Sequence, residues 1–291
     1  MMDPRLEHKH GQKRSRPFLK RRQFLELHEQ AWFPKIWRHL FRAGLGKAFV
    51  IFGFPAEISR VLSLFLDEQQ PPCLLDLCSG SGELSAHAWR QACSTGGNTA
   101  KCRLLLSDLY PEIELWSDLN PNIHFVPDSV DITNIETTNL DEDCTHTRMT
   151  LNSLHHFPPA ELRSLLDTTA NSCRGFIAID RDARNLREML ITIFIVPLAA
   201  AWITAFMLRP FRLQNVLWSL IIPVIPLVAL FDGIVSNLRS YTTTELHELC
   251  QENCPPSFEW RVGTTPGGHG APPLVYIIGS RESPQSAPCN P

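Results

Sequence analysis

Short apolar runs alternate with longer stretches of helical spacing through the middle of the chain. The short runs predict strands and the longer stretches predict helices, one of which opens at Thr242 with Glu245 three residues later, as in a capping box. Such alternation is typical of a mainly parallel sheet with helices on both faces. The predicted strands are residues 73–78, 103–107, 123–126, 147–152, 175–180 and 273–279, and the predicted helices are residues 83–93, 159–170 and 242–252.

The N-terminal region has two different patterns. Residues 1–16 are polar and basic, which predicts a disordered tail. Apolar and basic positions then alternate at helical spacing over residues 18–46, where Pro34 interrupts them, so we expect two helices or one kinked helix. A further helix is expected over residues 55–68, because Pro55 suits a first helical turn.

An apolar insert interrupts the later part of the chain at residues 189–231. Met189–Leu208 is a run of twenty residues without a charge, the length of a membrane-spanning helix, while Val216–Phe231 is shorter and holds two prolines. Arginines flank both runs, so the insert predicts either a spanning hairpin or a shallow hairpin in one leaflet. The alternative is a buried soluble cap or an oligomer interface, although a soluble cap should alternate polar and apolar faces.

Composition and charge narrow the class of protein. The 291 residues and the apolar fraction of 44% suit one α/β domain with extensions. A formal net charge of −3 does not indicate a nucleic-acid partner. The nine cysteines include no Cys-x-x-Cys pair, and the basic N-terminus has no apolar core behind it, so we expect reduced thiols and no secretory signal. The protein is therefore expected to be intracellular and membrane-associated, with a soluble cytoplasmic protein as the alternative.

A glycine-containing turn follows the first predicted strand. A turn of this kind between a strand and a helix points backbone N–H groups at a ligand, and glycine lets the ligand approach closely. The turn resembles the first motif of class I S-adenosylmethionine (SAM) dependent methyltransferases, with Cys78 in place of the first glycine. A nicotinamide site is the competitor, but Glu83-Leu84 stands where that motif needs a small residue. The residues of the turn are Asp76, Leu77, Cys78, Ser79, Gly80, Ser81 and Gly82.

Polar residues at the ends of the next three strands extend the resemblance. It implies that Asp108 binds the ribose hydroxyls, that Leu109 also contacts the cofactor, and that Asp131 and Ile132 meet adenine, with Asp128 as the fallback. Asn152 ends the fourth strand and opens a Leu-His-His-Phe segment that resembles the methionine-side wall of small-molecule methyltransferases. The resemblance implies a Rossmann-like class I methyltransferase fold with a mainly parallel seven-stranded sheet and SAM as the cofactor.

His155 and His156 are the candidates for a catalytic base. Methyl transfer is a displacement at a sulfonium carbon, and a base is needed only where the acceptor must lose a proton. Histidine suits this role because its ordinary pKa is about 6.5. A histidine that only shapes the pocket is the alternative, and we expect no metal, because no third ligand stands at a suitable spacing.

Five residues are candidates for substrate contacts. Asp180 and Arg181 follow the fifth strand, and the segment Phe231–Thr242 resembles one in uncharacterised methyltransferase-domain proteins that share the apolar insert and the Trp32-Phe33-Pro34 sequence. Structural ion pairs are the alternative for all five. The candidates are Asp180, Arg181, Asp232, Arg239 and Tyr241.

Together these features predict a SAM-dependent methyltransferase that acts on an apolar small-molecule or lipid-like acceptor, with residues 189–231 at a membrane. The alternatives are a non-catalytic membrane scaffold with a SAM-type fold and a nicotinamide-dependent oxidoreductase. The expected parts are a basic tail (1–16), a helical cap (17–70), the SAM-binding core (71–188), the apolar helical hairpin (189–231), the rest of the core (232–280) and a loose tail (281–291).

Overall fold

The described residues form a seven-stranded sheet in the order β3-β2-β1-β4-β5-β7-β6. In this sheet β7 runs antiparallel to both β5 and β6, and the remaining neighbours are parallel. This arrangement confirms the predicted Rossmann-like class I methyltransferase fold. The computed structural model describes residues 19–95, 102–120, 123–135, 146–181, 183–252, 258–265 and 273–281. The strands are β1 (Cys73–Asp76), β2 (Arg103–Leu106), β3 (Ile123–Phe125), β4 (Thr147–Leu151), β5 (Gly175–Arg181), β6 (Phe258–Thr265) and β7 (Leu274–Arg281).

Both faces of the sheet are buried, which explains why its strands are nearly continuous apolar runs. Successive side chains of a strand point to opposite faces. In β1, Leu74 therefore packs into the core on one face and Leu75 into the core on the other. In β5, Ile177 packs into the same core as Leu74, and Phe176 packs into the same core as Leu75.

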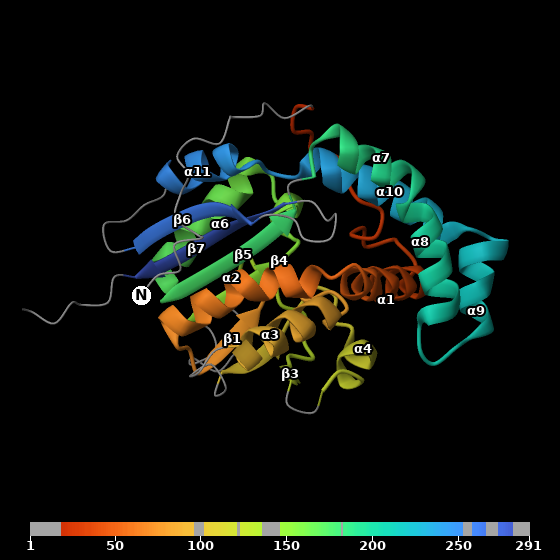
Figure 1. Cartoon of the computed structure of the whole chain (residues 1–291), viewed down its shortest axis with the longest axis horizontal. Helices are drawn as coiled ribbons and strands as arrows, with labels where there is room; N and C mark the ends of the chain where they lie inside the picture. Colours follow the sequence, from red (N-terminus) through yellow and green to blue (C-terminus); the bar gives the residue numbers. More distant parts are fainter. Residues whose placement is uncertain are drawn as a thin grey trace, which may run out of the picture.

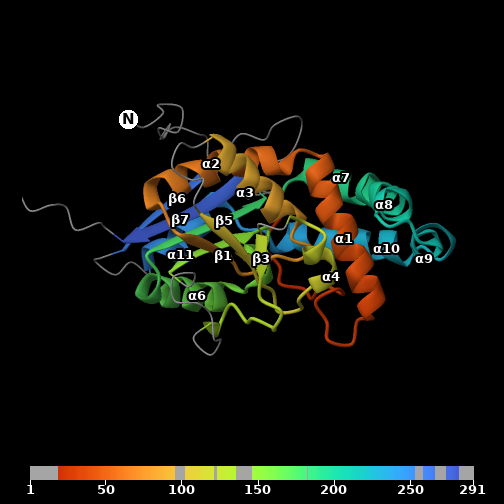
Figure 2. The same ribbon diagram turned by 90° about the horizontal axis from the view of Figure 1, so that it is seen from below.

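Helices cover the two faces of the sheet (Figure 1, Figure 2). Helices α2 (Phe54–Gln69) and α3 (Glu83–Thr95) pack together on one face, and α6 (Pro159–Ser172) and α11 (Thr243–Glu252) pack together on the other. The capping box is confirmed: the Glu245 amide donates to Thr242 Oγ1, and the Thr242 amide donates to Glu245 Oε2 at 2.9 Å. Two elements, α4 (Ile113–Ser117) and β6, were not predicted.

The prediction for the N-terminal region is wrong in one respect. Helix α1 (Lys35–Ile51) begins directly after Pro34, and within the described residues 19–33 there is no second helix. Side chains satisfy the backbone groups of this segment instead. Asp232 accepts from the amides of Leu27 and His28, and Arg38 donates to the carbonyl of His28.

The expectation that every thiol is reduced is wrong at Cys73, which is disulfide-bonded. Five other cysteines in the described part of the chain are free thiols: Cys78, Cys93, Cys102, Cys173 and Cys250. Apart from Arg281, the predicted tails at 1–16 and 281–291 lie outside the described residues.

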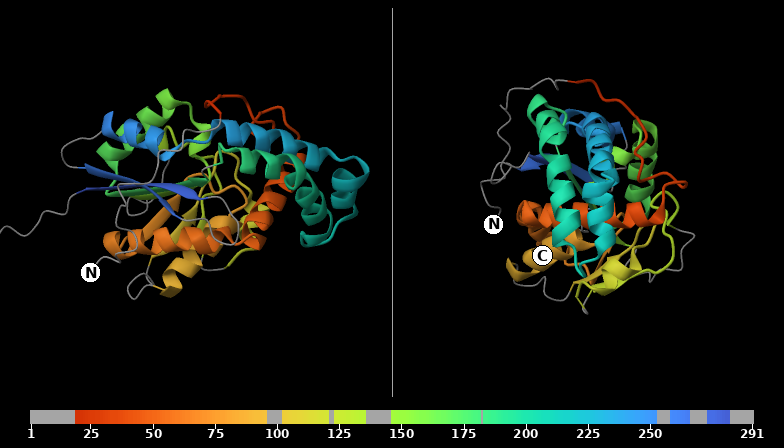
Figure 3. Two further views of the ribbon diagram at one scale, coloured as in Figure 1. Left: turned by 45° about the horizontal axis from the view of Figure 1, so that its top comes forward. Right: turned by 90° about the vertical axis from the view of Figure 1, so that its right-hand side faces the viewer.

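The expected helical hairpin follows β5 and stands beside the sheet, on the side toward which β5 points (Figure 1, Figure 3). The helices that contain the predicted insert of residues 189–231 extend over residues 186–239, and the name apolar insert refers to this longer range from here on. Helix α1 packs against α8, η5 and α10, so the insert is docked on the N-terminal region. Its elements are α7 (Leu186–Phe194), α8 (Val196–Trp202), the π-helical turn η5 (Ile203–Met207), α9 (Leu213–Val216), the π-helical turn η6 (Leu217–Ile221) and α10 (Val224–Arg239).

By length and composition, one helix of the described chain can cross a membrane. It runs over Leu186–Met207, 22 residues with a mean hydropathy of 2.3. Two bent pairs also pass as apolar units among the described residues, Leu213–Ile221 with Val224–Arg239 at 61° and Lys35–Ile51 with Phe54–Gln69 at 78°.

Candidate functional site

A buried carboxylate supports the turn after β1 from the interior of the protein. Asp76 is fully buried and accepts a hydrogen bond from Ser79 Oγ at 2.8 Å. The Ser79 hydroxyl in turn accepts from the amide of Ser107, at the end of the adjacent strand β2. Burial raises the pKa of Asp76 to about 6. Asp76 therefore fixes the turn from inside the protein and does not face its outer side.

The two glycines of the turn have different surroundings. Both adopt the left-handed region, with φ of 53° at Gly80 and 76° at Gly82. A Cβ added to Gly82 would lie 2.8 Å from Trp116 and 2.9 Å from Leu106, whereas a Cβ on Gly80 would meet nothing within 4 Å. Gly82 is thus required by packing, whereas the space beside the Gly80 Cα is open.

Asp108, just past the end of β2, is joined directly to this turn. Its carboxylate accepts from the Gly80 amide at 2.8 Å and from the Tyr110 amide at 2.9 Å. Arg42 of α1 donates to the same carboxylate at 3.2 Å. The structure therefore brings together two of the predicted cofactor residues, and it links the N-terminal helix to them.

The other predicted cofactor residues differ in exposure. Asp131 is exposed and accepts from the amide and hydroxyl of Thr133, while Ile132 is buried. Asn152 has a φ of 52°, and its side-chain oxygen accepts from Arg181 Nε at 3.2 Å. Leu109 is exposed, Ser81 is buried, and burial raises the pKa of the Cys78 thiol to about 12.

The two histidines stand on a 3-10 turn, η4 (Leu154–His156), directly after β4. His155 is buried, and its Nδ1 donates to Asp180 Oδ2 at 2.9 Å. Burial lowers the pKa of His155 despite the neighbouring Asp180. The His156 side chain is 26% exposed and is hydrogen-bonded to Glu29. Burial opposes its charged form, but Glu26 and Glu29 outweigh burial and raise the pKa of His156.

Glu26 lies between the two histidines and was not among the predicted site residues. It is 1% exposed and accepts from Ser236 Oγ at 2.7 Å. Burial opposes its ionisation, but His156 and His155 outweigh that effect and lower the pKa of Glu26. Sequence reasoning missed Glu26 because helical spacing predicted a helix in its segment, which forms none, and because Glu26 is far from the histidines along the chain.

Arg239 joins this group from the end of α10. It pairs with Glu26 and Glu29, each at 3.2 Å, and donates to the carbonyls of His155 and His156. We call Glu26, Glu29, His155, His156, Asp180 and Arg239 the polar cluster. Of the predicted substrate residues, Asp180 and Arg239 are thus buried in ion pairs.

Of the other three predicted substrate residues, Arg181 is partly exposed and donates to Asn152 at 3.2 Å. Tyr241 and Asp232 are buried. Tyr241 donates to the carbonyl of Phe157 at 2.7 Å, and Arg21 stacks over its ring at 4.0 Å. Asp232 pairs with His28 at 2.9 Å in addition to the two backbone amides. Both therefore fasten the N-terminal segment to the rest of the chain.

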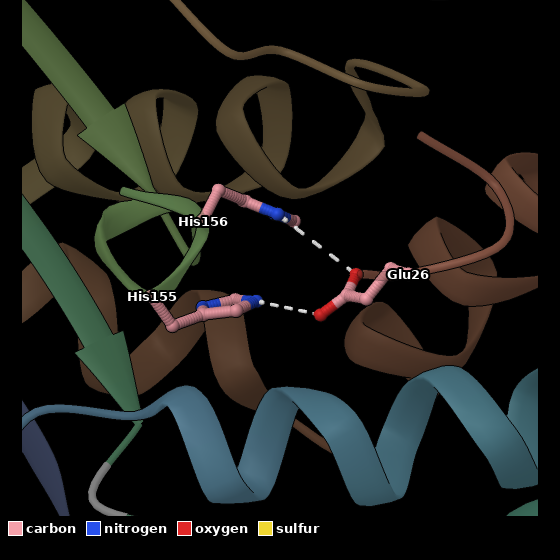
Figure 4. A group of neighbouring side chains, drawn as sticks. All are labelled: Glu26, His155 and His156. Atoms are coloured by element: carbon pink, nitrogen blue, oxygen red, sulfur yellow. Dashed lines mark ion pairs between the residues drawn. The ribbon is translucent and has the colours of Figure 1, made fainter. Parts of the chain in front are cut away.

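The reason given for expecting no metal is wrong. The side chains of Glu26, His155 and His156 each present a ligand atom, and these atoms all lie within 4.8 Å of one another (Figure 4). Adjacent histidines alone lacked a third ligand at suitable spacing, but the fold supplies one from the N-terminal segment.

No protein-family model and no curated protein matches the chain. Several solved structures are similar to the chain. Human N-acetylserotonin methyltransferase, in complex with SAM, is similar with a TM-score of 0.49 and 16% identity over 87% of this chain and 60% of that one. The plantazolicin methyltransferase, in complex with SAH, is similar with a TM-score of 0.47 and 14% identity over 84% of this chain and 95% of that one.

An O-methyltransferase family protein from Burkholderia thailandensis is similar with a TM-score of 0.44 and 15% identity, over 84% of this chain and 60% of that one. The chain thus spans three fifths of the length of the human and Burkholderia proteins. The strand order of the sheet, rather than these likenesses, defines the fold.

Proposed function

We propose that this protein is a SAM-dependent methyltransferase that acts on an apolar small-molecule or lipid-like acceptor at a membrane surface. One observation carries the proposal: the Gly80 amide donates to the carboxylate of Asp108 at the ends of adjacent parallel strands, and the space beside the Gly80 Cα is open. Nucleotide cofactors bind α/β folds at the carboxyl ends of their strands, where glycine lets a ligand approach the backbone closely.

The residues around this turn fit SAM. Gly80 offers space for the amino-acid part of the cofactor, since nothing lies within 4 Å of where its Cβ would be. A carboxylate has about four acceptor positions. Asp108 uses three of them on Gly80, Tyr110 and Arg42, so it retains capacity for a ribose hydroxyl. Exposed Asp131 and neighbouring Ile132 would border adenine.

SAM supplies a methyl group on a positively charged sulfur. The protein's own residues then serve to orient the two reactants and to exclude water from them. The two histidines of the polar cluster follow Asn152 by three and four residues. They lie on the carboxyl side of β4, where an acceptor would reach the cofactor. The partly exposed one, His156, is the histidine that would border the acceptor.

The exposed apolar side chains of the insert support the proposal that the protein acts at a membrane surface. Every fourth residue along α7, α8 and η5 is a large apolar side chain, and each is between 40% and 70% exposed. Each step of four residues turns about 40° around an α-helix, so this row winds over the exposed surface of the insert. We call these residues the apolar stripe: Leu186, Leu190, Phe194, Leu198, Trp202 and Phe206.

Polar side chains are buried inside the insert, in addition to the buried apolar side chains of α10. Buried Thr192 accepts from Asn237 Nδ2 at 2.8 Å, and Asn237 also donates to the carbonyl of Glu188. Polar groups that face inward and apolar groups that face outward are the arrangement expected of helices in contact with lipid. Glu188, Thr192, Thr204, Asn215, Ser219 and Asn237 are all buried.

The packing favours a hairpin that lies in one leaflet over one that spans the bilayer. Helix α1 and the N-terminal segment cover one side of the insert, where Phe33 and Leu40 pack against Ile225. Arg209 and Arg212 stand exposed at the tip, where they can reach lipid phosphates. The apolar stripe is then the part that enters the lipid.

Titration calorimetry with SAM and its demethylated product tests the cofactor assignment. Gly80→Val should abolish binding of both, because the added side chain fills the space above the turn. Gly53→Val is the matched control, since Gly53 also has a positive φ, of 78°, and nothing near its Cβ position. Equal loss of binding in both variants, or unchanged binding in Gly80→Val, refutes the placement of the site.

The same titrations separate the alternatives. Binding of a nicotinamide dinucleotide but not of SAM would identify an oxidoreductase. If the folded chain binds neither SAM nor its product, the scaffold alternative replaces the enzyme.

A further inference from the structure

We propose that Glu26, His155 and His156 bind one divalent transition-metal ion of the Zn²⁺ type. The three side chains converge from two parts of the chain: the histidines from η4 and Glu26 from the N-terminal segment (Figure 4). The ligands belong to the polar cluster that the proposed function places beside the acceptor, and metal binding can be measured whether or not the chain binds SAM.

The spacing of the three ligands fits an ion better than it fits direct bonds. His155 Nε2 lies 3.7 Å from Glu26 Oε1, and His156 Nδ1 lies 3.8 Å from Glu26 Oε2. Both separations exceed a hydrogen bond. Two ligands held at about 2.1 Å from a tetrahedral zinc ion stand about 3.4 Å apart, close to what is found here.

Asp180 orients one ligand as in established metal sites. A metal-bound histidine commonly donates its other ring N–H to a carboxylate, which fixes the ring and its tautomer. His155 Nδ1 donates to Asp180 Oδ2 at 2.9 Å, and the His155 amide donates to the same oxygen at 3.1 Å. The lone pair of Nε2 therefore faces Glu26.

The charges of the polar cluster leave room for a dication. Within the polar cluster, the carboxylates of Glu26, Glu29 and Asp180 stand with one guanidinium, that of Arg239. Metal-ligating imidazoles are neutral, so the charges of the six residues sum to −2, and Arg181 beside Asp180 reduces the local sum to −1, which still favours a cation. Glu29 holds Arg239 at 3.2 Å independently of Glu26, so Arg239 keeps a partner when Glu26 binds the ion.

A neighbouring set, Glu26, His28 and Asp232, meets the same distance criterion but fits an ion less well. His28 Nδ1 and Asp232 Oδ2 are hydrogen-bonded to each other at 2.9 Å, and the His28 amide donates to the same oxygen. The direct bond leaves no space for an ion between these two groups.

Two imidazoles and one carboxylate select the metal class. This set suits Zn²⁺ and related transition metals and leaves coordination positions open, whereas Mg²⁺ and Ca²⁺ prefer oxygen ligands alone. The ion would enter from the side of His156 and Glu29, the partly exposed members. Coordination replaces the hydrogen bond between these two residues and keeps the Glu29 carboxylate near the ion.

Calorimetric titration of the EDTA-treated full chain with ZnCl₂ tests the site, with native mass spectrometry for stoichiometry. We expect one Zn²⁺ per chain, and binding at least about tenfold weaker in Glu26→Gln and in His156→Gln. Glu112→Gln is the matched control, because Glu112 pairs with His39 elsewhere at 2.9 Å and should bind Zn²⁺ as the wild type does.

Substitution with Co²⁺ gives a readout that does not depend on a variant's folding. The wild-type chain with one Co²⁺ should show the visible absorption of a nitrogen- and oxygen-ligated ion. Absence of stoichiometric Zn²⁺ and of these bands, or equal Zn²⁺ affinity in all four folded proteins, overturns the proposal. SAM titrated into the same samples reports separately on the proposed function.

Discussion

The amide of Gly80 donates a hydrogen bond to the carboxylate of Asp108 at 2.8 Å. This bond connects the turn after β1 with the end of β2. It places a negative charge near the open space beside the Gly80 Cα. The relationship follows from the parallel pairing of the two strands, which brings their carboxyl ends to one edge.

Asp108→Asn should weaken SAM binding by about tenfold or more. The variant keeps the shape of the side chain but loses the charge, and a hydrogen bond to a charged group contributes about 1.5–3 kcal/mol. Calorimetry measures the change. Asp118→Asn, an exposed acid beyond α4, is the control and should bind SAM normally. Equal affinity in the two variants would remove Asp108 from the site.

Asp76→Asn should gain stability relative to the wild type as the pH rises from 4 to 8. Burial raises the pKa of Asp76 from 3.8 to about 6, so the folded protein favours the protonated acid. The contribution of Asp76 to the free energy of unfolding is therefore complete below pH 4. As the pH rises through 6, this free energy falls by about 3 kcal/mol. Urea unfolding of both proteins at each pH measures the difference. A constant difference contradicts the assigned burial effect.

Arg239→Met should destabilise the fold by about 3–5 kcal/mol, because it leaves the buried carboxylate of Glu26 without its cation. Chemical unfolding measures the loss. Arg261→Met is the comparison, since Arg261 pairs with Glu68 near the surface, where an ion pair contributes about 0–1 kcal/mol. Similar losses in both variants would show that the polar cluster does not hold the N-terminal segment.

Changing two residues of the apolar stripe, Leu198→Glu with Trp202→Glu, should release the protein from anionic lipid vesicles. Burying each large apolar side chain contributes about 1.5–3 kcal/mol, so the loss should exceed about 100-fold in partition. Vesicle flotation gives the partition coefficient. Ile113→Glu, on α4 and outside the insert, should bind vesicles as the wild type does. Wild-type protein that stays in solution contradicts the membrane proposal itself.

Local features of the sequence determined the order of strands and helices. Leu74 and Leu75 belong to a continuous apolar run because both faces of β1 are buried, and that pattern is visible along the chain. The turn at Gly80 and the cap at Thr242 were predictable for the same reason. Each depends on residues within a few positions of it, so periodicity and turn chemistry suffice.

Only the tertiary structure decided what surrounds the histidines. Glu26 reaches His155 and His156 because the N-terminal segment is fastened across the insert by Asp232, a contact between distant parts of the chain. The burial of polar Thr192 and the exposure of apolar Leu198 likewise depend on which side of the insert α10 and α1 cover. Sequence patterns describe neighbours along the chain, whereas the polar cluster and the apolar stripe are set by the path of the chain in space.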